Sequence, residues 1–210
     1  MLTQNQIDAN FDKFIFILEP VVKARGGNWE KLLAKLVNSD FKRAPASTKY
    51  HNNFEGGLVA HCLNVYDNLT HLVLYKHLED IISMESIVIC GLLHDISKIN
   101  FYEKTVKNKK VYSETGSKFD DLGRYDWVSE YTWTKKPESE LFIYGNHEET
   151  SEFMIRQYLP LKVEESVAIL SHHGGIGFDS HNQASTMFGR YELAALLHLA
   201  DMMAAYIDEK

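Results

Sequence analysis

The side chains that could do chemistry in this chain are histidines and aspartates spread over most of its length. His94 and Asp95 are adjacent at the end of an apolar run. Both are expected to be buried there, and a buried imidazole or carboxylate costs free energy unless it is hydrogen-bonded, paired or bound to a cation. Further candidates follow at intervals of 33, 52, 25 and 29 residues, in the order His61, His94-Asp95, His147, His172 and Asp201. The pattern predicts a metal centre assembled from several helices, and hence an enzyme.

The ligands indicate which metal ions would fit this centre. Imidazole and carboxylate groups suit borderline divalent ions such as Mn, Fe, Co, Ni or Zn. One or two ions could bind, with a carboxylate shared between them through its separate oxygens. Two ions about 3.5 to 4 Å apart can activate water and neutralise the charge that develops in a phosphoryl displacement. In this arrangement the first ion is bound by His61, His94, Asp95 and Asp201, and the second by His147, His172 and the shared Asp95.

Helices are expected to position the first ligands. Apolar residues recur at three- and four-residue steps over residues 58–77, and His61 lies beside this stripe. Residues 86–93 are apolar on nearly all sides, as in a central buried helix. This helix would deliver His94 and Asp95 into the interior of the protein.

The remaining elements place the other ligands and cover the core. After the insertion, helical patterning returns in three segments, with Pro160 and Gly174-Gly175 as breaks. The predicted elements are helices over residues 4–20, 28–38, 148–159, 163–173 and 190–208, and an ordered loop over residues 41–57. We interpret residues 1–40 as an N-terminal helical cover and residues 41–210 as the core, which contains an insertion at about residues 99–140.

The insertion loses the helical period and is predicted to form a small antiparallel sheet. Its residues alternate with period two over residues 127–134. We expect its aromatic residues, Trp127, Tyr131 and Trp133, to pack the insertion on the core, with base stacking as the alternative. Its lysines are expected to form a solvated face, with attraction of phosphates as the alternative. They are Lys104, Lys107, Lys109 and Lys110.

Length and composition limit the class of protein. With 210 residues, 45% of them hydrophobic, the chain can bury a substantial core in one domain. The net charge of −7 argues against broad attraction to nucleic-acid backbones or anionic membranes. No secretion signal or membrane span is recognised, so we expect a cytoplasmic protein without a membrane partner. Cys62 and Cys90 form no Cys-x-x-Cys motif and are expected to be inert core thiols.

Six segments carry a resemblance to a known family. They are Pro45–His51 (PASTKYH), Gly56–Tyr66 (GGLVAHCLNVY), Leu92–Lys98 (LLHDISK), His147–Glu149 (HEE), Ala168–Gly175 (AILSHHGG) and His198–Met202 (HLADM). Together they resemble the HD superfamily of metal-dependent phosphohydrolases, in a branch that is common in Firmicutes and their phages. The resemblance extends over about residues 44 to 205 and is specific at the level of the superfamily.

The resemblance implies an all-α fold, a helical bundle of five or more helices around a centre with one or two metal ions. It assigns the same primary and second-metal ligands as above. Lys98, three residues after Asp95, matches a lysine that approaches substrate phosphate in many members, so Lys98 and Asp95 are the expected catalytic residues. Either His172 or His173 could face the metals, and the alignment favours His172.

The implied activity is hydrolysis of a phosphate ester, above all a nucleotide or a related small phosphorylated metabolite. A 3′ to 5′ exonuclease acting on single-stranded nucleic acid, and a di-iron oxygenase with the same ligands, are the enzymatic alternatives. A metal-stabilised binding module is the non-enzymatic alternative. The oligomeric state is not readable from the sequence.

Each residue near the ligands could have either of two roles. His198 shares a helix face with Asp201, where a supporting hydrogen bond or packing is expected rather than metal binding. Arg43, Lys49 and His51 lie in the loop before His61. They could line a substrate pocket or hold the loop in place.

Overall fold

The computed structural model describes residues 1–174 and 181–209. This part of the chain contains eight α-helices and a three-stranded antiparallel sheet. The helices are α1 (Gln4–Ala24), α2 (Trp29–Val37), α3 (Gly57–Tyr75), α4 (Met84–Leu93), α5 (His147–Arg156), α6 (Val163–Ser171), α7 (His181–Arg190) and α8 (Glu192–Met203). The strands are β1 (Tyr102–Tyr112), β2 (Lys118–Asp120) and β3 (Gly123–Lys135). Short 3-10 helices, η1 (Ile96–Lys98) and η2 (Glu138–Glu140), and a π-helical turn, η3 (Ala204–Asp208), complete the elements. The predicted mostly helical fold with a small antiparallel insertion is confirmed.

The central helix of the bundle is α4. It is buried from Ser86 to Leu93 and packs against α1, α3 and α6. Where α4 crosses α3, Gly91 lies so close to Tyr66 that a Cβ at position 91 would stand 2.7 Å from the Tyr66 Cα. The absence of a side chain at Gly91 therefore lets the two helices approach each other. This approach places the rings of His61 and His94 5.4 Å apart, at the same end of the pair.

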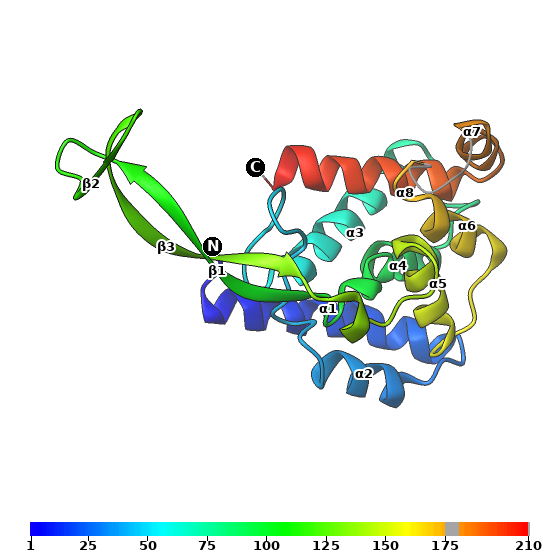
Figure 1. Cartoon of the computed structure of the whole chain (residues 1–210). Helices are drawn as coiled ribbons and strands as arrows, with labels where there is room; N and C mark the ends of the chain where they lie inside the picture. The colour runs from blue at the N-terminus through cyan, green and yellow to red at the C-terminus, as the bar shows by residue number, and fades with distance from the viewer. Residues whose placement is uncertain (175–180, 210) are drawn as a thin grey trace.

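The first helix is longer than the sequence predicts. The prediction ends at residue 20, whereas α1 continues through Pro20 to Ala24. Its buried stripe includes Leu18 and Val22, on either side of the proline, while Pro20 itself is exposed. The apolar stripe outweighs the hydrogen bond that the proline removes from the helix. As a result α1 runs beneath α3 and α4 in the view of Figure 1 and packs against both, with α2 on its other side.

The C-terminal helices differ in part from the prediction. α8 packs against α3, α6 and α7, but it ends at Met203 and is followed by a π-helical turn rather than continuing to residue 208. α7 was not predicted, because its segment carries mostly polar and small residues. Gly175, the last residue of one HD-like motif, lies outside the described residues. None of the helices in the described part is both long and apolar enough to cross a membrane.

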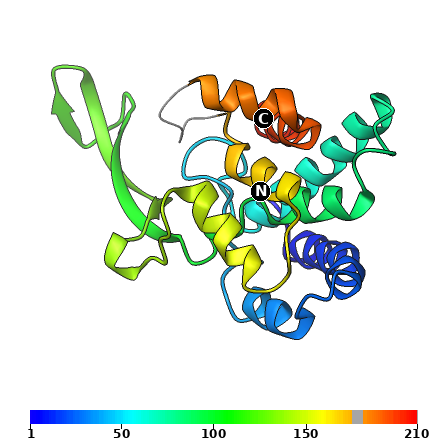
Figure 2. The ribbon, with the colours of Figure 1, turned by 90° about the vertical axis from the view of Figure 1, so that its right-hand side faces the viewer.

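Residues 102–135 form an arm that projects from the helical bundle. β3 pairs with β1 along the whole length of β1 and with the short β2 on its other edge, all antiparallel. Figures 1 and 2 show the arm extending away from the helices in both views. The predicted packing of its aromatic residues on the core is therefore wrong for Trp127 and Tyr131, which are 49% and 76% exposed. Alternation predicted the strands correctly, but it could not show that both faces of the sheet are largely exposed.

Candidate metal centre

Asp95 lies at the middle of a buried cluster. In the chain it follows His94, the residue that caps the C-terminus of α4. Its side chain is 1% exposed, and its two oxygens face different imidazoles. Oδ2 lies 3.6 Å from His61 Nε2 and 3.7 Å from His94 Nε2. Oδ1 lies 2.6 Å from His147 Nε2 and 3.8 Å from His172 Nε2. The structure thus arranges the four histidines as two pairs, one pair on each oxygen of a single carboxylate.

Asp201 adds a second carboxylate from α8. Its Oδ1 lies 3.0 Å from His61 Nε2 and 4.0 Å from His94 Nε2. Its Oδ2 lies 3.9 Å from His173 Nε2. α8 delivers this group because it packs across α3, the helix that carries His61. All six ligands predicted from the sequence therefore lie in one cluster.

The hydrogen bonds of His94 and His172 fix which ring nitrogen carries the proton. Nδ1 of His94 lies 3.1 Å from the Gly91 carbonyl oxygen, and Nδ1 of His172 lies 2.6 Å from the Ile169 carbonyl oxygen. A carbonyl oxygen only accepts, so both Nδ1 atoms donate and each Nε2 of the neutral ring keeps its lone pair. Both Nε2 atoms are buried without a hydrogen-bond partner among the described residues. A cation beside Asp95 would satisfy both lone pairs.

His61 is oriented by a carboxylate from the end of the chain. Its Nδ1 donates to Glu209 Oε1 over 3.1 Å, and the Glu209 side chain is 1% exposed. Asn64 also donates to this oxygen, over 2.9 Å. Burial lowers the pKa of His61, but the hydrogen bonds to Asp201 and Glu209 outweigh burial and raise it to about 10. A carboxylate behind a histidine is a common support for a metal ligand, because it fixes the ring and makes it more basic.

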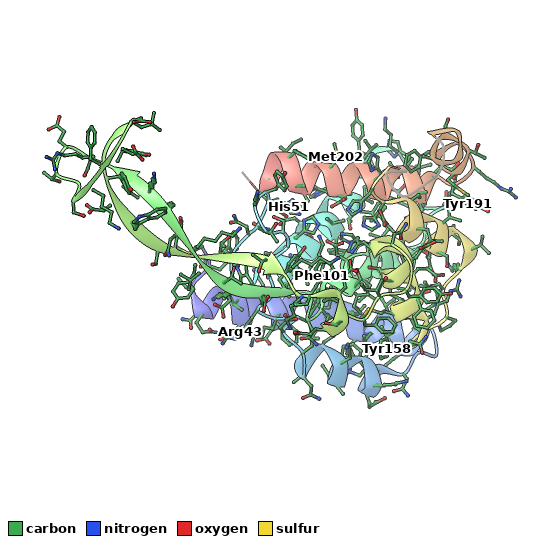
Figure 3. The ribbon with its side chains drawn as sticks, viewed as in Figure 1. Arg43, His51, Phe101, Tyr158, Tyr191 and Met202 are labelled. Carbon is green, nitrogen blue, oxygen red and sulfur yellow. The ribbon has the colours of Figure 1, made fainter. Side chains whose placement is uncertain are left out.

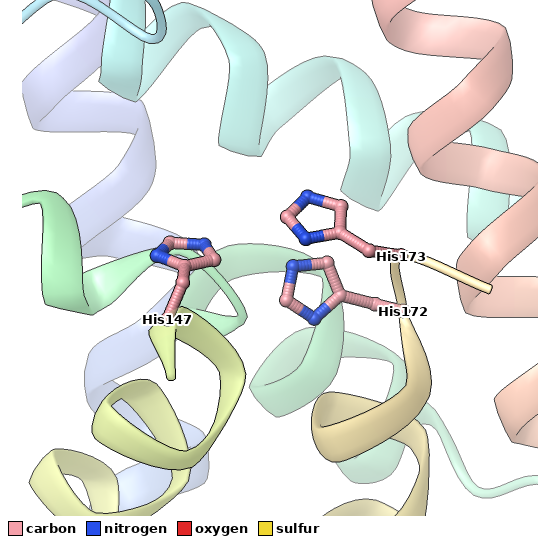
Figure 4. Close-up of side chains that lie close together, drawn as sticks. All are labelled: His147, His172 and His173. Atoms are coloured by element: carbon pink, nitrogen blue, oxygen red, sulfur yellow. The ribbon is translucent and has the colours of Figure 1, made fainter. Parts of the chain in front are cut away.

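His147, His172 and His173 form the second side of the cluster. Each contributes a ring nitrogen, and these atoms all lie within 4.8 Å of one another. Figure 4 shows the three rings converging from the start of α5 and the end of α6. His147 is also held by Ser97, whose Oγ lies 2.7 Å from its Nδ1, and His173 by Glu148, over 2.8 Å. Both residues of the His172-His173 doublet therefore face the cluster.

Lys98 contributes a positive charge next to the shared carboxylate. Its Nζ lies 2.6 Å from Asp95 Oδ2, and its side chain is 11% exposed. Burial would raise the pKa of Asp95, but the charges of Lys98 and the neighbouring histidines hold this pKa well below its usual range. Burial lowers the pKa of His94 to about 3. At neutral pH Asp95 is therefore ionised and His94 neutral, which are the states that metal ligands need.

These donors fit a divalent metal ion. The described residues offer overlapping groups of three donor atoms within 4.8 Å of one another, and the set contains imidazole nitrogens and carboxylate oxygens but no thiolate. Such donors accept the borderline ions Mn, Fe, Co, Ni and Zn. Each of the four groups contains at least one predicted ligand. They are His61, His94 and Asp201; His94, Asp95 and His172; His147, His172 and His173; and His51, His61 and Glu209.

No family model, curated protein or solved structure matches this chain. The likeness of its motifs to the HD superfamily therefore stays a prediction from the sequence. The arrangement of His, Asp and Lys side chains around Asp95 is the observation that bears on function.

Two supporting residues, Glu209 and Ser97, were not predicted from the sequence. Glu209 follows a helical pattern that gives no sign of a buried carboxylate, and only the π-helical turn brings it back to His61. Ser97 lies inside the motif around Asp95, but a serine gives no chemical signal until Ser151, which donates to it over 2.9 Å, and His147 are seen beside it. His173 was recognised only as an alternative to His172, because adjacent residues on a regular helix point in different directions.

Of the other residues discussed from the sequence, some lie beside the cluster and others lie on the surface. His51 lies in the loop before α3 (Figure 3), with its ring 4.8 Å from that of His61. Its Nε2 is buried, and none of the described residues bonds to it. Arg43 is half exposed and pairs with Glu55, which ties the loop to itself. Lys49 is exposed. His198 donates from Nδ1 to the His172 carbonyl oxygen over 2.6 Å and so supports a ligand, as predicted. Both cysteines are free and buried, namely Cys62 and Cys90.

Proposed function

We propose that this protein is a metal-dependent phosphohydrolase of the HD superfamily, acting on a nucleotide or a related phosphate ester. The proposal rests on the position of the Asp95 carboxylate, because each of its two oxygens faces a separate pair of histidines. Divalent ions bound at this cluster would supply Lewis acidity toward phosphate oxygens and lower the pKa of a water molecule. One or two ions of Mn, Fe, Co, Ni or Zn would suit the donors.

The chain's own residues have definable parts in such a reaction. The ammonium group of Lys98 lies beside Asp95. There it would stabilise the negative charge that develops on phosphate oxygens in the transition state. Glu209 keeps the His61 ring in one orientation, with Nε2 toward the two aspartates. Ser97 does the same for His147 through its Nδ1. The ligands are thus held in place before substrate arrives.

A cleft beside the cluster supports a nucleotide as substrate. It has a volume of about 250 Å³, and His147 forms part of its wall together with Phe101, Phe142 and Lys135. Phenylalanine rings can stack with a base, and a lysine can bind phosphate as a point charge. The cleft lies between the base of the arm and the start of α5, so substrate bound there would reach the cluster from the side of His147.

The test is product analysis by liquid chromatography and mass spectrometry. Metal-free protein is loaded with Mn²⁺ and incubated with bis(p-nitrophenyl) phosphate and with mixed nucleoside mono-, di-, tri- and cyclic phosphates. We expect conversion by the wild type, and a loss of at least about a hundredfold in Asp95→Asn, since this change weakens both halves of the cluster. Asp67→Asn, which removes an exposed carboxylate on α3, is the matched control and should retain activity. Absence of hydrolysis, with oxygen uptake by the iron-loaded protein instead, would overturn the proposal.

A further inference from the structure

The arm presents two chemically different faces. Residues that are paired across an antiparallel sheet lie on the same face. The register pairs Tyr112 with Tyr125, Lys110 with Trp127, Val106 with Tyr131 and Lys104 with Trp133. The four aromatic residues of β3, Tyr125, Trp127, Tyr131 and Trp133, therefore share one face, which we call the aromatic face. The opposite face of β3 carries Arg124, Asp126, Val128, Glu130, Thr132 and Thr134.

Lysines accompany the rings of the aromatic face. Lys104 Nζ lies 5.0 Å from the centre of the Trp133 ring, and Lys110 Nζ lies 4.4 Å from that of Tyr125. Lys135, at the end of β3, lies on the same face opposite Tyr102. No Asp or Glu of β1 or β3 lies on this face. Lys104, Lys110 and Lys135 do pair with carboxylates of other segments, but they remain 35% to 47% exposed.

The aromatic face is exposed although it is rich in large rings. Trp127 is 49% exposed and Tyr131 is 76% exposed. Tyr125 and Trp133 are half-buried. Large apolar groups exposed side by side mark a site of interaction. Aromatic rings flanked by lysines are the composition that binds single-stranded nucleic acid, because each base can stack on a ring and each phosphate can approach an ammonium group.

Charge restricts such a ligand to the arm. The arm carries seven basic and six acidic side chains, against 15 basic and 23 acidic side chains in the rest of the chain. A polyanion is therefore repelled by most of the molecule and attracted to the lysines of the arm, in a salt-dependent way.

The aromatic face is also continuous with the candidate metal centre. Lys135 at its base lines the same cleft as His147 of the cluster. Lys104 reaches Glu55 in the loop before α3, over 3.0 Å. A strand lying along the rings would thus enter the cleft beside His147.

We propose that the aromatic face of the arm binds single-stranded nucleic acid, with bases stacked on the rings of β3 and phosphates beside the lysines, and leads the strand to the cleft at His147. That the bound strand is also the substrate rests on the proposed hydrolysis, whereas the binding does not. Stacking on rings does not distinguish DNA from RNA, so both strands have the chemistry that this face recognises.

Binding is measured by fluorescence anisotropy with labelled oligothymidylate and labelled oligouridylate, on the full chain in the presence of EDTA. We expect the wild type to bind at least one of the two, and more weakly as salt increases. Trp127→Ala and Tyr131→Ala should each weaken binding about fivefold to a hundredfold, because each removes a stacking platform. Trp127→Tyr keeps a ring and should bind nearly as the wild type does, which separates stacking from folding of the arm.

Matched controls lie on the opposite face. Val128→Ala and Thr132→Ala change neighbouring residues of β3 that point away from the rings. Lys107→Gln removes a charge from the opposite face of β1, as Lys110→Gln does from the aromatic face. Only the variants of the aromatic face should lose affinity beyond about twofold.

Three outcomes would overturn the proposal. The first is that the wild type binds neither oligonucleotide. The second is that variants of the two faces lose equal affinity. The third is that the wild type is a dimer that Trp127→Ala dissociates, which would make this face a contact between chains. Hydrolysis of bis(p-nitrophenyl) phosphate is measured on the same variants and should not change. If that hydrolysis is absent in all proteins while strand binding holds, the proposed function fails and the binding surface stands.

Discussion

Asp95 is the residue on which the cluster depends, because each of its oxygens has different neighbours. The sequence indicated its importance through an apolar run that ends in two polar side chains. The run predicted burial, and burial of a histidine and an aspartate predicted a cation. The division of the histidines into two pairs was not visible in the sequence, since it depends on how four helices meet.

Glu209 is predicted to matter through its effect on His61. Glu209→Gln keeps the shape of the side chain but weakens its hold on His61 Nδ1, so we expect affinity for Mn²⁺ to fall about tenfold to a hundredfold. Isothermal titration of metal-free protein measures this affinity. Asp208→Asn is the matched control, because Asp208 is an exposed neighbour that bonds Asn68 rather than a metal ligand. Equal affinity of the wild type and Glu209→Gln would contradict a supporting role.

At the scale of elements, the crossing of α3 and α4 sets the distance between the first two histidines. The hydrophobic period predicted both helices nearly to their ends, because one buried stripe and one fully buried run leave clear patterns. It did not predict how closely they pack. That closeness depends on Gly91 meeting the backbone of Tyr66, which is a contact between distant parts of the sequence.

Two glycine substitutions test this crossing. Gly91→Ala would place a methyl group 2.7 Å from the Tyr66 Cα, so we expect the free energy of unfolding to fall by about 1 to 3 kcal/mol. In Gly189→Ala, in α7, the new Cβ meets no atom within 4 Å. This change should raise the free energy of unfolding by about 0.5 kcal/mol, through helix propensity alone. Urea unfolding followed by circular dichroism measures both. A loss of stability in both variants would point to a general intolerance of alanine rather than to the crossing.

A buried ion pair connects α1, α4 and α6. Arg25 contacts both oxygens of Glu165, at 2.9 and 3.0 Å, and Ser86 donates to the same carboxylate over 2.7 Å. Burial would raise the pKa of Glu165, but these hydrogen bonds outweigh it and lower the pKa below its usual value of 4.5. Because the pKa is lower in the folded than in the unfolded chain, the pair stabilises the fold above about pH 4.5. This stabilisation is lost as the pH falls through the lowered pKa.

Glu165→Gln is therefore expected to have a pH-dependent cost. At neutral pH it should reduce the free energy of unfolding by about 2 kcal/mol, since Arg25 loses its charged partner. The difference from the wild type should shrink as the pH falls below about 4.5. Urea unfolding at several pH values measures it, with Glu164→Gln on the same helix as the control. A difference that does not vary with pH would show that the charge of Glu165 is not the cause.

At the scale of the whole molecule, metal binding is expected to stabilise the folded chain. The donors come from α3, α5, α6, α8 and the end of α4, so they are together only when the bundle is formed. At a Mn²⁺ concentration 100 times the dissociation constant, the gain is about 2.7 kcal/mol. For a protein of this size it corresponds to a rise in Tm of roughly 5 to 10 °C. Differential scanning calorimetry with and without EDTA measures it, and an equal rise in Asp95→Ala would place the ion elsewhere.

The sequence by itself determined the helices other than α7, the antiparallel strands and the chemical types of the ligands, because periodicity and burial of polar residues are local properties. The tertiary structure alone decided that Asp95 divides its oxygens between two pairs of histidines, and that Glu209 returns to His61. It also decided that the arm stands free with its aromatic face uncovered. Each of these depends on contacts, or on the lack of contacts, between segments far apart in the chain. No pattern along one segment specifies what packs against it.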